Sequence, residues 1–431
     1  MWLFYSFAAL LLFQSLLSLR GGFRYLRFFR RELRRGPTDF TPFASVIVPC
    51  RGVDQGLREN VAALLQQDYP AYELIFVFDD ARDPSSCIVE DALRANARAV
   101  GPLDINNANE RANMAGGASV NVAARIVVAG RAQDCGQKVH NLRVAVTKIS
   151  TASEVLVFVD TDARTRRDWL RSLVAPLADE RAGATTGYRW FVPRARAGIC
   201  SHIRSVWNAA IASALGADTR RNFCWGGSTA IRRETFDRLN ILEAWRGALS
   251  DDFALTRALQ RAEAPIKFVP ACLVASHEDC TWRELFEFTT RQMKITRVHA
   301  PHLWRIVLAS NLIFCAVFYG GIILAASLAL RGESFIGPLA FIFIIFALGA
   351  CKSGLRLAAV KLVLAREGLR ITIAARLAHL SLWTLTAALY LYNALAALFS
   401  RRITWRGITY EMKSPTETII LAPSTRRDDQ S

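Results

Sequence analysis

The sequence predicts an α/β fold with a mostly parallel sheet, joined to membrane helices. Short runs of β-branched and aromatic residues at 44–48, 73–78 and 155–159 are typical of buried strands. Helical patterns separate these runs, and strands that alternate with helices form βαβ units around a parallel sheet. Of the 431 residues, 52% are hydrophobic, and long apolar segments lie towards both ends of the chain. These segments predict the membrane part.

The first apolar segment, residues 2–19, is followed by seven arginines up to Arg35. A secretory signal peptide carries its positive charge before the apolar run, whereas here the charge comes after it. We therefore predict an uncleaved anchor at residues 1–20, about as long as one membrane span requires. A signal peptide is the alternative. The positive-inside rule then places the chain after Arg20 in the cytoplasm, as a protein of the cell (inner) membrane.

Three more apolar segments, at 306–330, 335–350 and 377–399, predict a multi-pass protein. Basic residues interrupt the stretch 352–370, which suits an amphipathic helix lying in the membrane interface. Three spans after a cytoplasmic domain would leave the arginine-rich tail outside, against the charge rule. One segment is therefore expected to be re-entrant or interfacial, and the sequence leaves open which one. This gives membrane or interfacial helices at 304–400 and a polar tail at 401–431.

The formal net charge of +17 could indicate a nucleic-acid partner or an anionic membrane surface. The basic residues follow the boundaries of the apolar segments, and they do not form an aromatic-laced face. The pattern therefore predicts the lipid bilayer as a partner and no nucleic acid.

Two carboxylates, Asp160 and Asp162, directly follow the apolar run 155–159. Ligands of open α/β sheets bind beyond the carboxyl ends of the strands. Mg²⁺ takes one or two protein carboxylates and leaves its other positions to water and substrate phosphate. The pair therefore predicts a site for one divalent cation, with a solvated acidic turn as the alternative.

Two further acidic pairs stand at similar positions. Asp79 and Asp80 end the second predicted strand, and Asp251 and Asp252 open a helix that Ser250 can cap. Transfer of a group from a nucleotide diphosphate to a hydroxyl needs such a set. One pair could contact the nucleotide and another the metal, while the third removes the proton of the acceptor.

The leaving diphosphate needs cationic stabilisation, for which Lys138, Arg291 and Lys294 are candidates. The alternative for each is a solvated basic helix face. Gly226 and Gly227 are adjacent and permit either a close backbone approach to a ligand or a tight structural bend.

Seven motifs occur in an order that resembles glycosyltransferase family 2. They are P-C-R-G (49–52), F-V-F-D-D (76–80), G-Q-K-V-H-N-L (136–142), V-D-T-D (159–162), G-G-S-T-A-I-R (226–232), S-D-D-F-A-L (250–255) and R-Q-M-K-I (291–295). The chain is most similar to the ceramide glucosyltransferase group, which includes bacterial hopanoid-type relatives. The tail motif W-R-G-I-T-Y (405–410) is also similar to those bacterial members. The resemblance covers residues 40–300 and the membrane layout.

The resemblance implies a GT-A (Rossmann-like) domain at 40–300 and an inverting transfer assisted by Mg²⁺ or Mn²⁺. The donor implied is a UDP-sugar of the glucose or N-acetylglucosamine type, and the acceptor is a hydroxyl of a ceramide- or hopanoid-like membrane lipid. By position, the resemblance implies nucleotide contact for Asp80 or Asp79, diphosphate contact for Lys138, metal binding for Asp160 and Asp162, and general-base catalysis for Asp252 with Asp251 beside it.

One motif departs from the family pattern. The family's (Q/R)-x-x-R-W falls on Arg291 to Ile295, so that Lys294 replaces an arginine and Ile295 a tryptophan. Lysine keeps the charge but loses the guanidinium fork, and isoleucine offers no aromatic platform. A processive polysaccharide synthase is an alternative function, although few spans are available for a polymer channel. A non-catalytic nucleotide-binding membrane scaffold is another.

Overall fold

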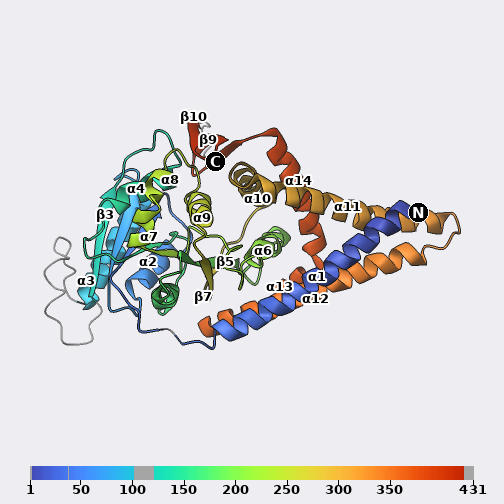
Figure 1. Cartoon of the computed structure of the whole chain (residues 1–431), viewed down its shortest axis with the longest axis horizontal. Coiled ribbons are helices and arrows are strands. Elements are labelled where there is room, and N and C mark those ends of the chain that lie inside the picture. Colours follow the sequence, from blue (N-terminus) through green and yellow to red (C-terminus); the bar gives the residue numbers. More distant parts are fainter. Residues whose placement is uncertain (1, 37, 101–120, 422–431) are drawn as a thin grey trace. The chain divides into compact units, whose positions relative to one another are not determined.

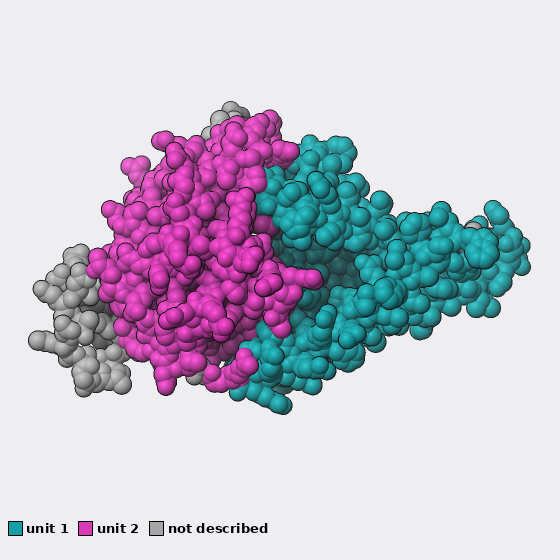
Figure 2. All heavy atoms as spheres, viewed as in Figure 1, with its two compact units in different colours: residues 1–34, 190–214, 277–400 teal, residues 35–189, 215–276, 401–431 magenta. Residues whose placement is uncertain are grey.

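The structure, a computed structural model, describes residues 2–36, 38–100 and 121–421 (Figure 1). The chain divides into two compact units, which Figure 2 shows in different colours. The helical unit comprises residues 1–34, 190–214 and 277–400, and the sheet unit comprises residues 35–189, 215–276 and 401–431. Each unit is therefore built from segments that are separated in the sequence.

The described residues of the main sheet form seven strands in the order β3-β2-β1-β4-β6-β5-β7. The strands are β1 (Ala44–Cys50), β2 (Ala71–Phe78), β3 (Asn121–Val128), β4 (Val155–Phe158), β5 (Ala184–Phe191), β6 (Thr229–Arg232) and β7 (Ile266–Ser276). β1 to β4 pair in parallel, whereas β6 is antiparallel to both β4 and β5. The predicted α/β class with a mostly parallel sheet is confirmed.

Short helices connect these strands. They are α2 (Leu57–Leu65), α3 (Pro84–Val100), α4 (Gln137–Val146), α5 (Trp169–Val174), the 3₁₀ helix η2 (Ala175–Ala178), α7 (Arg233–Arg238), α8 (Ile241–Ala244) and α9 (Asp251–Arg261). Helix α4 begins at Gln137, directly after Gly136, whose backbone is extended. Lys138 therefore lies in the first turn of α4.

The register of the central strands determines where the acidic pairs lie. Ile47 of β1 stands opposite Ile75 of β2 on one side and Phe158 of β4 on the other, and all three are buried. Parallel strands in register end at the same edge of a sheet, and β2 and β4 are followed by Asp79 and Asp160. The sheet therefore brings two of the acidic sites to one edge.

Strand β3 begins at Asn121, and residues 101–120 before it lie outside the described residues. The C-terminal segment, predicted as a polar tail, forms a small antiparallel sheet through residue 421. Its strands are β8 (Arg402–Trp405), β9 (Ile408–Ser414) and β10 (Glu417–Leu421). Tyr410 and Met412 of β9 are fully buried, so this sheet has its own packed face.

The helical unit contains the apolar segments. Its helices are α1 (Trp2–Glu32), α6 (Ile199–Ala212), α10 (Trp282–His299), α11 (Pro301–Leu330), α12 (Ile336–Leu364), the 3₁₀ helix η3 (Ala365–Glu367), α13 (Ile373–Ser381) and α14 (Trp383–Phe399). Ala8, Phe318 and Ile345 belong to an apolar cluster that joins α1, α11 and α12. Among the described residues, three helices are long and apolar enough to cross a membrane: Trp2–Glu32, Pro301–Leu330 and Ile336–Glu367.

One expectation about the C-terminal helices was wrong. The basic stretch 352–370 was expected to form a separate interfacial helix, but α12 runs through it to Leu364. The helix continues because Leu357, Val360 and Val363 extend its buried apolar stripe. The segment 377–399 falls on α13 and α14, which are bent by 61° and form either a broken span or a re-entrant loop. The expectation that one apolar segment is re-entrant or interfacial therefore stays a prediction.

Leu142 tests the packing that positions Lys138. Its side chain, on α4, is fully buried in the cluster that includes Ile47, Ile75 and Trp245. We expect Leu142→Ala to lower the free energy of unfolding by about 2–5 kcal/mol, because the cavity it leaves cannot close completely. Lys148→Ala is the matched control at an exposed position just after α4 and should change stability by less than about 0.5 kcal/mol. Thermal unfolding of the detergent-solubilised protein measures both, and equal effects would contradict this view of the core.

Candidate active site

Lys138 connects two of the predicted acidic sites. Its ammonium Nζ lies 2.7 Å from Asp160 Oδ1 and 3.3 Å from Asp251 Oδ1, so it bridges the end of β4 and the start of α9. All three side chains are largely buried. Burial alone would lower the pKa of Lys138, but the carboxylates of Asp160, Asp251 and Asp252 raise it above its usual value. The lysine is therefore a permanent cation at this site.

Arg189, on β5, is the second cation. Its Nη1 lies 3.0 Å from Asp162 Oδ2 and its Nη2 3.6 Å from Asp160 Oδ2, while its guanidinium carbon lies 5.0 Å from the Trp225 ring centroid. Burial raises the pKa of Asp160, but Lys138 and Arg189 outweigh burial and lower it. Sequence reasoning did not select Arg189, although an arginine in an otherwise uncharged strand was an available signal.

The two carboxylates at the start of α9 differ in environment. Asp251 is buried, and burial raises its pKa to about 6 against the opposing effect of Lys138. Asp252 is partly exposed and accepts a hydrogen bond of 2.7 Å from the Phe253 backbone N–H. The prediction that Ser250 caps α9 through its side chain was wrong. Its hydroxyl donates to the Asp252 carboxylate instead, because that acceptor is two residues away.

Because Gly226 has no side chain, its backbone can lie close to the Lys138–Asp251 ion pair. A Cβ at this position would lie 2.4 Å from Asp251 Oδ2 and 2.6 Å from Lys138 Nζ. The backbone at residue 226 therefore packs directly against the ion pair. At Gly227 a Cβ would lie 2.2 Å from the Trp225 ring, so there the glycine serves local packing.

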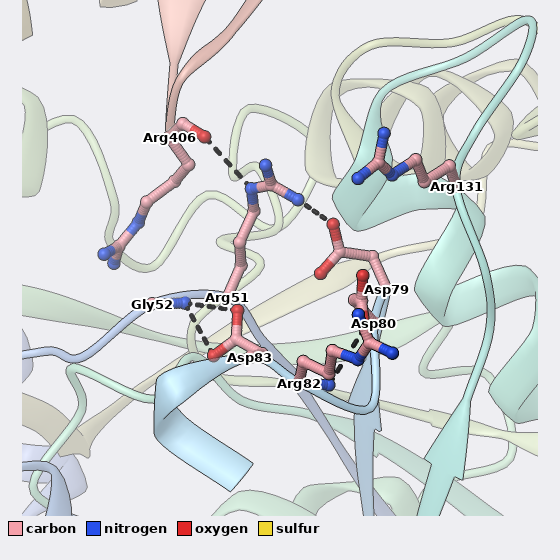
Figure 3. A pocket seen from close by; sticks show the side chains of 8 residues that line it. All are labelled: Arg51, Gly52, Asp79, Asp80, Arg82, Asp83, Arg131 and Arg406. Carbon is pink, nitrogen blue, oxygen red and sulfur yellow. Dashed lines mark hydrogen bonds and ion pairs between the residues drawn. The ribbon is translucent and has the colours of Figure 1, made fainter.

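A cavity of about 410 Å³ lies at the ends of β1 and β2 (Figure 3). Its lining residues are Arg51, Gly52, Asp79, Asp80, Arg82, Asp83, Arg131 and Arg406. Asp79 is buried and forms an ion pair with Arg51, whereas Asp80 is exposed. The Gly52 backbone N–H donates to both carboxylate oxygens of Asp83. Arginines and aspartates thus alternate around the opening.

The hairpin of β8 and β9 contributes to this cavity although it follows the last apolar helix in the sequence. Arg406 forms an ion pair with Asp54, and its carbonyl accepts a hydrogen bond of 3.0 Å from Arg51 Nε (Figure 3). Asp54 also accepts a hydrogen bond of 2.5 Å from Thr161 Oγ1. Thr161 stands between Asp160 and Asp162, so the hairpin is linked to the D-T-D segment.

Arg291 and Lys294 belong to α10 of the helical unit. The Arg291 guanidinium lies over the Phe288 ring, 5.7 Å from its centroid. Burial lowers the pKa of Lys294. Their contact with the diphosphate stays a prediction.

Asp160 and Asp162 fit a divalent cation that shares its coordination with a substrate. Among the described residues, no group of three or more His, Cys, Asp or Glu side chains could hold a metal ion. Mg²⁺ needs only one or two protein carboxylates when phosphate oxygens complete its coordination. In the structure both carboxylates are paired with cations, Asp160 with Lys138 and Arg189, and Asp162 with Arg189.

The mostly parallel α/β sheet thus carries carboxylate pairs at its strand ends, beside a cavity lined by arginines and aspartates. The chain belongs to Glycosyl transferase family 21, whose model matches residues 5–100 and 118–418. The resemblance to the ceramide glucosyltransferase group is thereby confirmed at the level of the family. The protein is an enzyme of the nucleotide-sugar glycosyltransferase class.

Two solved structures are similar to the chain at low identity. The mannosyltransferase PcManGT from Pyrobaculum calidifontis, in complex with GDP-Man and Mn²⁺, is 19% identical, with 91% of this chain and 97% of that chain covered and a TM-score of 0.43. Glucosyl-3-phosphoglycerate synthase from Mycobacterium tuberculosis, in complex with Mn²⁺ and uridine-diphosphate-glucose, is 16% identical, with 59% and 78% covered and a TM-score of 0.36.

Gly226→Ala tests the close packing around the ion pair. The added Cβ meets the ends of two flexible side chains, so the fold can accommodate it only by separating Lys138 from Asp251. We expect the melting temperature to change little and glycosyltransferase activity to fall by about tenfold or more, since small displacements of catalytic groups are costly. Gly216→Ala is the control, because a Cβ there meets nothing within 4 Å. Full activity of Gly226→Ala would contradict the role of this contact.

Proposed function

We propose that this protein is a membrane-bound inverting glycosyltransferase that moves a hexose of the glucose or N-acetylglucosamine type from a UDP-sugar to a lipid hydroxyl. The acceptor is a ceramide- or hopanoid-like lipid of the cell inner membrane, and the sheet unit faces the cytoplasm. One observation carries the proposal: Lys138 forms ion pairs with both Asp160 and Asp251. It thereby connects the carboxylates proposed for the metal and diphosphate with those proposed for the acceptor proton.

The donor binds along the edge of the sheet. The uridine occupies the cavity beside Asp79 and Asp80, and the diphosphate extends towards Lys138 and Arg189. In the structure these two cations pair with Asp160 and Asp162. The bound diphosphate offers them a second anionic partner, so their charge stabilises the leaving group as the bond to the sugar breaks.

Asp160 and Asp162 would hold a Mg²⁺ or Mn²⁺ ion at the end of β4. Such an ion supplies Lewis-acid stabilisation of the negative charge that develops on the leaving UDP. Arg189 contacts both carboxylates and Lys138 contacts Asp160, so the pair is held in place before any ligand arrives. Lys138 and Arg189 therefore hold the carboxylates of Asp160 and Asp162 in position for binding.

Asp252 accepts the proton of the acceptor hydroxyl. The hydroxyl oxygen then bonds to the anomeric carbon as the bond from that carbon to the diphosphate oxygen breaks, and UDP leaves with the electron pair. Asp252 is the more accessible of the two carboxylates, because Asp251 is buried and its carboxylate is engaged by Lys138. Asp252 lies in the first turn of α9 and accepts a hydrogen bond from the Phe253 backbone N–H.

The lipid nature of the acceptor is supported by three helices of membrane-spanning length and by the match of the family model across them. Arg291 and Lys294 of α10 are proposed to contact the diphosphate or the acceptor. Lys294 and Ile295 replace the family's arginine and tryptophan. This replacement suits an acceptor that is not bound through bidentate hydrogen bonds from a guanidinium.

A transfer assay tests the proposed function. Membranes that contain the protein are incubated with labelled UDP-glucose or UDP-N-acetylglucosamine, extracted lipids, and Mg²⁺ or Mn²⁺. We expect a labelled product that extracts with lipids, disappears when EDTA removes the metal and returns when Mn²⁺ is restored. No turnover of either donor would contradict the proposal. A labelled product that lengthens with time would favour the processive synthase.

Asp252→Asn tests the proton acceptor. An amide cannot take the proton, so we expect the rate of transfer to fall by about 10²–10⁴-fold while the affinity for UDP changes little. Asp237→Asn, an exposed carboxylate on α7, is the matched control and should keep full activity. Full activity of Asp252→Asn would show that another group is the base.

A further inference from the structure

We propose that the C-terminal hairpin is part of the donor site and that Arg406, at its turn, binds the diphosphate of the nucleotide sugar. This inference rests on the proposed function, because it assigns a further binding residue to the same donor. It also assigns a binding role to a segment that the sequence predicted only as a polar tail.

The conformation of the turn is the first observation. β8 and β9 pair up to Trp405 and Ile408, so the loop consists of Arg406 and Gly407 alone. Both have positive φ, 50° and 76°, as a type I′ turn requires. Asn and Gly are the favoured residues there, and a long side chain in the left-handed region is uncommon. An arginine at this position points to a function of its side chain.

The second observation is where the hairpin holds this residue. Arg406 lines the cavity that Asp79 and Asp80 also line, and its carbonyl accepts from Arg51, the ion-pair partner of Asp79 (Figure 3). Its guanidinium pairs with Asp54, which accepts from Thr161 in the D-T-D segment. Arg406 therefore lies between the proposed uridine cavity and the proposed metal site, where a diphosphate must pass.

The Arg406 guanidinium has the chemistry of an anion-binding group. Its planar fork of N–H donors matches the oxygens of a phosphate. The Arg406 side chain is 36% exposed, although its partner Asp54 is 9% exposed. Four arginines and three aspartates line the cavity, so its charge also suits an anionic ligand.

The hairpin is firmly attached to the rest of the sheet unit. The buried Tyr410 hydroxyl accepts a hydrogen bond of 3.3 Å from the Gln137 N–H, one residue before Lys138. At Gly247, in the loop before α9, a Cβ would lie 2.0 Å from the Thr416 carbonyl oxygen. The turn between β9 and β10 therefore packs closely against that loop. This attachment gives Arg406 a fixed position, as a binding residue needs.

The test compares UDP with uridine as ligands of the full-length protein in detergent with Mn²⁺. Arg406→Gly removes the guanidinium and suits the positive φ, so the turn should persist and the melting temperature should hold. We expect the affinity for UDP to fall by about 10- to 100-fold and the affinity for uridine to change by less than about twofold. Arg406→Lys should restore part of the UDP affinity, because it keeps the charge without the fork.

Arg402→Ala is the matched control, since Arg402 lies on the same hairpin, is exposed and pairs with Glu411 of β9. It should bind UDP as the wild type does. Unchanged UDP affinity in Arg406→Gly would overturn the inference, as would an equal loss for UDP and uridine, which would indicate a role in shaping the cavity. A wild-type protein that binds UDP but transfers no sugar to lipid would overturn the proposed function and leave this inference standing.

Discussion

The constraint on which the site depends is the charge balance around Lys138. Asp160 and Asp251 come from different parts of the sheet unit and are both largely buried, so each needs a positive partner in place. Removing the shared cation would leave uncompensated buried charge, which typically costs about 3–5 kcal/mol. The start of α4 at Gln137 and the absence of a side chain at Gly226 both serve this contact.

Arg189 provides a positive partner for Asp162, the second carboxylate of the D-T-D segment. Thr161, between the two carboxylates, donates to Asp54, which is itself paired with Arg406. The protein thus surrounds one strand end with cations from α4, β5 and the C-terminal hairpin. Such an arrangement can receive a metal and a diphosphate together, because their opposite charges find partners that are already fixed.

The sequence predicted those parts of the fold and site that depend on local patterns. The buried strands before Asp79 and Asp160 were apparent from their apolar runs, and α9 from the acidic residues at its start. Arg189 and Arg406 were not selected as site residues, because their ion-pair partners are distant in the sequence. Arg189 pairs with Asp162 of another strand end, and Arg406 pairs with Asp54, more than 200 residues before it. The R-G pair at 406–407 between apolar runs was a usable hairpin signal.

The helical unit shows the same division between local and long-range information. Hydropathy located α1 and α11. The basic residues after residue 350 suggested that a helix ends there, but α12 continues, because Val360 and Val363 are buried by packing. The 61° bend between α13 and α14 lies within a segment whose apolar composition is continuous, so composition could not predict it.

The central claim is that the Lys138 network is the diphosphate site, and calorimetric titration of UDP into the folded Lys138→Gln protein with Mn²⁺ tests it most directly. The account predicts an affinity at least about tenfold below that of the wild type, because a charge-assisted contact to phosphate is lost. An affinity equal to that of the wild type would contradict it.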